Sequence, residues 1–229
     1  MNAPTARSVL LVFVKRPTPG EVKTRLAVAL GAQTAAELYR ALVAATLANT
    51  APQADEYRRV VCFSPPEAEA EIASWLAGER RAAQSAGDLG ARMQAAFAQA
   101  FAEGAARVAL IGSDLPTITR GDVRDALGAL DDHDVVLGPS ADGGYYLIAL
   151  ARPQPALFER IPWSSAAVLE QTLARARAAG LRVHRLAQRR DVDRLEDLCA
   201  EWPALAPLLQ ADLARRIARR VPRRVTRRL

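Results

Sequence analysis

Lysine is almost absent from this chain: its 229 residues include 29 arginines but only two lysines, Lys15 and Lys23. Cysteine and histidine are also scarce, with two residues of each. The cysteines lack the spacing of metal ligands, the histidines lie far apart in the sequence, and no serine, cysteine and histidine form a pattern typical of a catalytic triad. The sequence therefore gives no support for a cysteine-ligated metal centre or for nucleophilic catalysis by serine or cysteine.

Long hydrophobic runs are missing too. No apolar stretch approaches the roughly 18 to 20 residues of a membrane-spanning helix. The apolar start of the chain has no small-residue cleavage site, so we interpret it as a first strand and not as a signal peptide. Cys62 and Cys199 are distant in sequence and suit free thiols in a reducing compartment, which leads us to expect a cytoplasmic protein.

The excess of positive charge is confined to one end of the chain. The formal net charge is +6, but residues 211–229 hold eight arginines and one aspartate. Without this segment the net charge is −1. The body of the protein is therefore not expected to bind nucleic acid.

Half of the residues are hydrophobic, which is enough for a substantial core. Short apolar runs rich in β-branched residues predict strands at 8–14, 59–63, 108–111, 134–137, 145–150 and 181–186. Segments of helical periodicity predict helices at 32–49, 67–77, 89–103, 119–130, 164–179 and 195–202. The alternation predicts an α/β fold: a single doubly wound, mainly parallel sheet flanked by helices, with active-site loops at the carboxyl ends of the strands.

The last residues are predicted to be separable. We expect one domain over residues 1–210 and a basic, arginine-rich tail over 211–229. Apolar residues recur every four positions in this tail, at Leu213, Ile217, Val221, Val225 and Leu229. As a helix, the tail would carry an apolar stripe between arginine pairs and could make weak contact with an anionic membrane surface. Pro222 interrupts the pattern, which favours a solvated terminus.

Both lysines fall in one nine-residue window after the first predicted strand. A compact ammonium on a flexible stem differs from a planar guanidinium, so a site that needs lysine would keep it in an arginine-rich chain. Thr18 as N-cap, Pro19 at the first helical position and Glu21 predict that a capped helix begins here.

The free N–H groups at such a helix start favour an anion, and Gly20 permits close backbone approach. Lys15, Lys23 and Arg25 would then surround the same point. The segment predicts a phosphate site, and three solvated cations beside a capped helix are the alternative.

Three aspartates follow predicted strands. Asp114 lies at the end of 108–111, where a carboxylate could hold a divalent metal that bridges phosphate oxygens, or could make a turn or cap. Asp191 and Asp193 alternate along an extended segment, so both carboxylates would point the same way and could share a cation. The alternative is a surface cluster of ion pairs with the neighbouring arginines at 189, 190 and 194.

Two glycine-containing segments complete the candidates. Asp142, Gly143 and Gly144 lie between apolar runs and predict a hairpin, and they could also let a sugar or phosphate ester approach the backbone. Gly90 and Arg92 precede or open a predicted helix and could close over a nucleotide, although a helix-entry loop explains them equally well.

Together these segments resemble a bacterial family of glycosyltransferase-like proteins, the DUF2064 group, within the nucleotide-diphospho-sugar transferase superfamily. The resemblance spans residues 8–202 and rests on six motifs in order: Lys15–Leu26, Leu89–Met93, Ile111–Pro116, Val136–Ile148, Trp163–Ser164 and Asp191–Asp193. It implies a GT-A-like fold, a nucleotide or nucleotide-sugar substrate and a divalent metal, Mg²⁺ or Mn²⁺. Asp114 resembles the metal-binding aspartate of that superfamily.

The layout is also similar to guanylyltransferases that build molybdenum and deazaflavin cofactors, in which a Lys-x-Arg-Leu segment contacts the triphosphate. That similarity implies phosphate contacts for Lys23 and Arg25. The resulting candidates are catalytic Lys23 and Asp114; phosphate-binding Lys15, Pro17, Gly20, Lys23, Arg25, Gly90 and Arg92; acceptor-binding Asp142, Gly143 and Gly144; and metal-binding Asp114, Asp191 and Asp193.

Three functions remain open at this point. The first is a metal-dependent glycosyltransferase that uses a nucleotide-diphospho-sugar and a small-molecule acceptor. The second is a nucleotidyltransferase that joins a nucleoside triphosphate to a phosphorylated small molecule and releases pyrophosphate. Ser113 leaves a single acidic residue at the end of strand 108–111, which keeps this second function open. The third is a non-catalytic nucleotide-binding module tethered by its basic tail.

Overall fold

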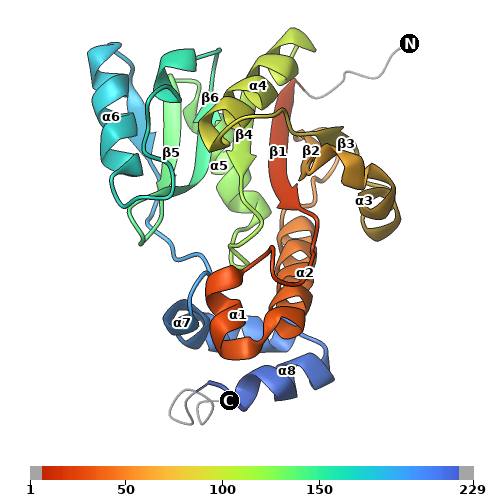
Figure 1. The fold of residues 1–229 in the computed structure, drawn as a ribbon. Helices are drawn as coiled ribbons and strands as arrows, with labels where there is room; N and C mark the ends of the chain where they lie inside the picture. The colour runs from red at the N-terminus through yellow and green to blue at the C-terminus, as the bar shows by residue number, and fades with distance from the viewer. Residues whose placement is uncertain (1–6, 222–229) are drawn as a thin grey trace.

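A seven-stranded mixed sheet forms the centre of the molecule (Figure 1). The computed structural model describes residues 7–221. The strands are β1 (Ser8–Lys15), β2 (Arg58–Ser64), β3 (Arg81–Ala83), β4 (Arg107–Ile111), β5 (Val135–Pro139), β6 (Tyr145–Leu150) and β7 (Val183–Arg185). Their order across the sheet is β3-β2-β1-β4-β6-β5-β7, and every neighbouring pair is parallel except the two that involve β6.

Helices cover both faces of this sheet. They are α1 (Thr24–Leu30), α2 (Ala32–Asn49), α3 (Glu69–Trp75), α4 (Leu89–Ala102), α5 (Arg120–Ala129), α6 (Val168–Ala178), α7 (Leu195–Leu205) and α8 (Ala211–Ala218), with short 3₁₀ turns at Pro66–Ala68, Pro155–Leu157 and Ala206–Leu208. Buried residues of α2, α3 and α5 pack on one face, and those of α4 and α6 pack on the other. The predicted class, an α/β fold with a mostly parallel sheet flanked by helices, is confirmed.

The central strand β1 shows why the apolar runs form strands. Leu10, Val12 and Val14 belong to one buried cluster, whereas Val9 and Leu11 belong to the cluster on the opposite face. Side chains alternate along a strand, so a strand covered on both faces must be apolar at every position. This explains why the run is recognisable from the sequence.

The hairpin predicted around residues 142–144 is confirmed, and it makes the sheet mixed. β5 and β6 are antiparallel, and the backbone of Gly143 has a φ of 91° at the turn between them. Gly143 also packs so closely that a Cβ atom would lie 2.3 Å from the carbonyl oxygen of Ala166. Glycine is therefore required there by backbone conformation and by space.

Several local features differ from the predictions, including the helix expected at 164–179, which begins only at Val168. The short edge strand β3 was missed because its sequence, Arg-Ala-Ala, contains no β-branched apolar run. The helix expected to begin at Pro19, with Thr18 as its N-cap, begins instead at Thr24, and residues 19–20 form a turn in which Glu21 N–H donates to the Thr18 carbonyl at 3.0 Å. The predicted cap, formed by Thr18 and Glu21, is therefore absent from this helix.

Four helices, α1, α2, α7 and α8, gather beyond the carboxyl end of β1 (bottom of Figure 1), and we call them the helical layer. Their shared core contains Leu26 of α1, Leu42 of α2, Trp202 of α7 and Ile217 of α8, each at most 2% exposed. Helix α2 packs on the sheet with one side and on this layer with the other.

The first half of the predicted tail belongs to the helical layer. Leu213, Ile217 and Val221 are all buried in its core, so up to residue 221 the apolar stripe is neither solvated nor presented to a membrane. The periodicity was correctly identified, but its partner was not, because the sequence gives no sign of which surface an apolar stripe covers. Val225, Leu229 and Pro222 lie outside the described residues, and the expected domain division at 210/211 remains a prediction.

Among the helices of residues 7–221, none combines the length and the apolar character that crossing a membrane would require.

Replacing Ile217 with alanine tests whether α8 contributes to the fold. Ile217 is fully buried, so Ile217→Ala is expected to lower the free energy of unfolding by about 2–4 kcal/mol in urea denaturation. Val28→Ala is the control, because Val28 is 90% exposed and should change stability by less than about 0.5 kcal/mol. Equal small effects of the two substitutions would contradict the docking of α8.

The carboxylate of Asp134, just before β5, is expected to stabilise the fold in a pH-dependent way. Its carboxylate accepts the Arg182 backbone N–H at 3.0 Å and pairs with Arg152 at 2.9 Å. The backbone hydrogen bond, helped by the Arg152 charge, lowers the pKa of this carboxyl in the folded state. A lowered pKa stabilises the fold above the unfolded pKa and loses this effect as pH falls through the folded pKa.

We therefore expect Asp134→Ala to cost about 1–2 kcal/mol at pH 7 and progressively less as the solution is acidified below about pH 4. Urea melts at several pH values measure this difference, with Asp132→Ala on the exposed neighbouring position as the control. A deficit that is independent of pH would show that the stabilisation does not come from the Asp134 charge.

Candidate functional site

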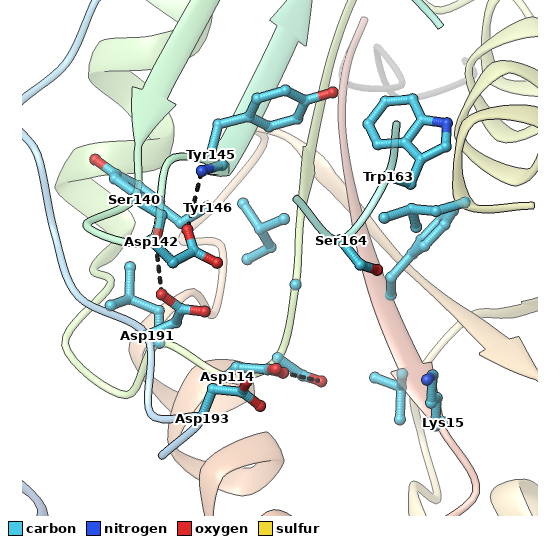
Figure 2. Close-up of a pocket in the computed structure, with 18 of the residues that line it drawn as sticks. Lys15, Asp114, Ser140, Asp142, Tyr145, Tyr146, Trp163, Ser164, Asp191 and Asp193 are labelled. Carbon is cyan, nitrogen blue, oxygen red and sulfur yellow. Dashed lines mark hydrogen bonds between the residues drawn. The ribbon is translucent and has the colours of Figure 1, made fainter. Parts of the chain in front are cut away.

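A cleft of about 570 Å³ lies at the carboxyl ends of β1 and β4. It draws together nine of the candidates selected from the sequence: Lys15, Lys23, Arg25, Arg92, Asp114, Asp142, Gly144, Asp191 and Asp193. Figure 2 shows four aspartates on one side of the cleft, with Lys15, Ser164 and Trp163 on the other. The cleft thus lies at the sheet edge where active-site loops were expected to gather.

The other four candidates do not line the cleft. Pro17 and Gly20 belong to the loop between β1 and α1, and Gly143 lies at the hairpin turn. Gly90 packs against Trp163, which lines the cleft. A Cβ atom at position 90 would lie 2.4 Å from Nε1 of Trp163 and 2.7 Å from the carbonyl oxygen of Phe158. Gly90 is thus explained by the close approach of α4 to Trp163.

The Lys23 ammonium is the most buried charge of the site. Its Nζ donates to Oδ2 of Asp114 at 2.8 Å and lies 3.8 Å from Oδ1 of Asp193. The Lys23 side chain is only 3% exposed, whereas the Asp114 side chain is 40% exposed. One cation therefore bridges the end of β4 and the segment before α7.

The backbone of Lys23 has the left-handed conformation, with φ 48° and ψ 42°. This conformation costs a residue with a side chain about 1 kcal/mol or more, and such strain concentrates at functional sites. It turns the chain from the loop into α1 and places the ammonium in the cleft.

Arg25, two residues later, donates from Nη1 to Oδ2 of Asp193 at 2.6 Å. Asp193 therefore has two cationic partners. In the described structure, Lys23 and Arg25 neutralise carboxylates, which differs from the direct phosphate contacts that were expected of them.

Asp191 has a different environment. Its Oδ1 accepts a hydrogen bond of 2.5 Å from the Ser140 hydroxyl, and within residues 7–221 it has no cationic partner. Burial is the main cause that raises the pKa of the Asp191 carboxyl, and the nearby charges of Asp142 and Asp114 raise it further.

The predicted alternation of Asp191 and Asp193 is consistent with the structure, because both line the cleft while Val192 between them is fully buried in the helical layer. The Val192 N–H also donates to the Asp114 carbonyl at 3.0 Å, which fixes this segment against the end of β4.

Two of the three arginines next to these aspartates pair elsewhere: Arg189 binds Asp122 at 2.5 Å, and Arg190 binds Asp197 at 3.0 Å. The third, Arg194, forms no ion pair within residues 7–221. The alternative of a local surface cluster around Asp191 and Asp193 is therefore not what the structure shows.

The sequence did not reveal a buried pair of hydroxyl groups next to Lys15, those of Tyr39 and Ser113. The Lys15 backbone N–H donates to Oη of Tyr39 at 2.8 Å, and this Oη lies 3.1 Å from the Ser113 hydroxyl. Burial, together with the Asp114 charge, raises the pKa of Tyr39, so the phenol stays protonated. Tyr39 belongs to a helix whose pattern explains it as a core residue, so nothing in the sequence connected it to the site.

Trp163, Ser164 and Ser140 were also missed as site residues, although each lies in one of the six motifs. Ser164 has a positive φ of 67°, a second strained backbone position at the cleft. Arg92 also lines the cleft, and its Nε donates to the Gly87 carbonyl at 2.8 Å. Neither Arg92 nor Lys15 has a carboxylate partner within residues 7–221.

The carboxylates of Asp114, Asp191 and Asp193 are hard oxygen donors of the kind that Mg²⁺ and Mn²⁺ prefer. No group of three or more acidic, histidine or cysteine side chains within residues 7–221 is arranged to hold a metal ion. The donor set therefore fits a cation that uses one or two carboxylates and completes its shell with water and phosphate oxygens, as Mg²⁺ commonly does.

Known structures of this fold identify its class. A protein from Desulfovibrio desulfuricans G20, described as a "putative nucleotide-diphospho-sugar transferase", is 37% identical, with a TM-score of 0.83 over 87% of this chain and 88% of the other. CMP:2-keto-3-deoxy-manno-octonic acid synthetase in complex with CTP aligns at 16% identity and a TM-score of 0.53, covering 88% of this chain and 99% of the other. The chain thus has the fold of nucleotide-sugar and nucleotidyl transferases.

The chain belongs to the DUF2064 family, described as "Uncharacterized protein conserved in bacteria", whose model matches residues 46–165. A more distant protein of the same fold, Rv0371C from Mycobacterium tuberculosis H37Rv in complex with manganese, aligns at 14% identity and a TM-score of 0.50 over 86% of this chain and 97% of the other. No curated protein sequence matches the chain.

Substitutions at Lys23 test the strain in its backbone. Lys23→Gly and Lys23→Ala both remove the ammonium, but glycine adopts the left-handed conformation without cost. We expect the glycine variant to be about 1 kcal/mol more stable than the alanine variant in urea denaturation. At Val28, inside α1, the order should be reversed, because glycine costs about 1 kcal/mol in a helix. An alanine variant at position 23 that is as stable as the glycine variant would contradict the strained conformation.

Proposed function

We propose that the protein is a metal-dependent transferase that takes a nucleotide-diphospho-sugar, transfers the sugar to a small acceptor and releases a nucleoside diphosphate. One observation carries the proposal: within the part of the chain that the structure describes, the cleft at the carboxyl edge of a nucleotide-transferase sheet is lined by two unpaired cations, Lys15 and Arg92, and by four aspartates, and Lys15 lies across the cleft from the aspartates (Figure 2). The similarity to the Desulfovibrio protein supports the choice of substrate class.

The unpaired cations would bind the phosphates of the substrate. Lys15 and Arg92 have no acidic partner in the described chain, so they can bind an anion without first breaking an ion pair. Lys23 and Arg25 lie close by and would stabilise the charge that develops on the leaving diphosphate. Preorganised charges of this kind commonly make the largest electrostatic contribution to such a reaction.

The carboxylate wall would hold the metal and the acceptor. Asp114, with Asp193 or Asp191, would bind Mg²⁺ or Mn²⁺, which neutralises phosphate charge when bound. Asp142 and Gly144 would contact acceptor hydroxyls. The hydroxyl of Ser140 orients Asp191 toward the cleft.

Nucleotidyl transfer is the second candidate, and one feature of the site favours it. Ser113 and Asp114 leave only one carboxylate at the end of β4, while two cations, Lys23 and Arg25, come from the loop and helix that follow β1. More positive charge near the phosphates suits a triphosphate, whose leaving group would be pyrophosphate.

A thermal-shift series with nucleotide-sugars and nucleoside triphosphates, with and without Mn²⁺, tests both candidates. A ligand present at about 100 times its Kd stabilises the native state by about 2.7 kcal/mol. For a protein of this size we expect the melting temperature to rise by about 5–10 °C with a nucleotide-sugar and Mn²⁺. Asp114→Asn should lose the metal-dependent part of the shift, whereas Asp125→Asn, which removes an exposed charge from α5, should keep it.

The leaving group separates the two candidates. Release of a nucleoside diphosphate from the nucleotide-sugar supports sugar transfer. A shift confined to a triphosphate, with pyrophosphate release, supports nucleotidyl transfer and overturns the first proposal. No shift with any nucleotide, with or without metal, contradicts both.

A further inference from the structure

The position between Asp114 and Asp193 is already occupied by a charge. Lys23 Nζ lies 2.8 Å from one carboxylate and 3.8 Å from the other, and its side chain is nearly inaccessible to solvent. These are the oxygens that a divalent cation would need at the end of β4. An ammonium and a divalent cation cannot both occupy this position, because like charges at such separations repel strongly.

The left-handed backbone conformation of Lys23 holds its ammonium between the two carboxylates. Lys23 retains a side chain in a left-handed conformation that glycine would adopt without strain, and Lys23 is one of only two lysines in the chain. Arginine could not replace it easily, because a guanidinium is larger and would not fit as a compact point charge between two carboxylates.

The rest of the cleft differs in its charge balance. Asp191 and Asp142 have no cationic partner in the described chain, and Lys15 has no carboxylate partner there. Of the cleft's described aspartates, only Asp114 and Asp193 form ion pairs, with Lys23 and Arg25, before any ligand binds. The two lysines of the cleft therefore have different surroundings although they carry the same charge.

We propose that Lys23 is an internal counter-ion that competes with the divalent cation for Asp114, so that cation binding at this carboxylate displaces the ammonium into the cleft. The inference rests on the metal dependence in the proposed function. It assigns Lys23 a second state, in which its ammonium is free to approach a phosphate oxygen. The site then gains Lys23 as a further phosphate-binding cation, in addition to Lys15 and Arg92, only when the metal is present.

The Mn²⁺ affinity of the nucleotide-free protein tests the competition. Lys23→Gln removes the ammonium and keeps much of the length of the stem, and we expect it to tighten Mn²⁺ binding about tenfold, because one positive charge leaves the immediate vicinity of the ligand oxygens. Calorimetric titration or the electron paramagnetic resonance signal of free Mn²⁺ measures this affinity. Lys15→Gln is the matched control: it removes the same charge from the same cleft but not from between the carboxylates, and it should change the affinity less than about threefold.

The contrary outcomes are distinct. Unchanged or weaker Mn²⁺ binding by Lys23→Gln overturns the proposal, as does equal tightening in Lys15→Gln, which would indicate a general field effect. Absence of Mn²⁺ binding in every variant also overturns it. Tightening that survives when Asp114→Asn is added to Lys23→Gln would place the cation elsewhere and overturn the competition for Asp114. Because no nucleotide is present, failure of the transferase proposal in the thermal-shift series does not alter these outcomes.

Amine labelling of the unmodified protein gives an independent test that does not depend on the folding of a variant. The chain has only two lysines, so mass spectrometry can follow each separately. Saturating Mn²⁺ should increase modification of Lys23 several-fold and leave Lys15 almost unchanged. Equal labelling of Lys23 with and without Mn²⁺ at saturation would contradict the displacement.

Discussion

The arrangement of the cleft depends on one buried ammonium that meets two carboxylates from distant parts of the chain. Lys23 belongs to the loop after β1, Asp114 to the end of β4 and Asp193 to the segment before α7. Backbone contacts hold these three segments together without the help of the charges: β1 pairs with β4, and the N–H of Val192 donates to the Asp114 carbonyl. The backbone thus brings the charges together, and the distribution of free cations and free carboxylates across the described cleft follows from which of them are paired.

Much of this architecture was predictable because it depends on local patterns. The strands β1 and β6 are apolar runs buried on both faces, and the hairpin at Gly143 is dictated by a backbone conformation that favours glycine. The two lysines stood out because so few occur, and the structure places both in the cleft. A strand-end aspartate and an alternating aspartate pair were identifiable because parallel strands deliver the residues after them to one edge of the sheet.

The remaining features depend on tertiary contacts that no local pattern encodes. Gly90 was predicted to close over a nucleotide, but its neighbour is Trp163, which lies far along the chain from it. Tyr39 reaches the site from a helix in which it resembles any core aromatic. The pairing of Lys23 with Asp114, in place of the expected free cation, follows from a left-handed residue that the sequence pattern does not single out.

The helical layer also has a consequence for synthesis of the chain. Leu26 of α1 is fully buried in a core that also includes Trp202 of α7, and α1 contacts α7, so part of its cover is translated 176 positions after it. At roughly 5–20 residues per second, the ribosome needs about 10–40 s to cover that distance. During this interval α1 exposes apolar surface, and the segment that carries Lys23 has no finished surroundings. Assembly of the cleft is therefore a late event in biogenesis, completed only when Asp193 and α7 have left the ribosome.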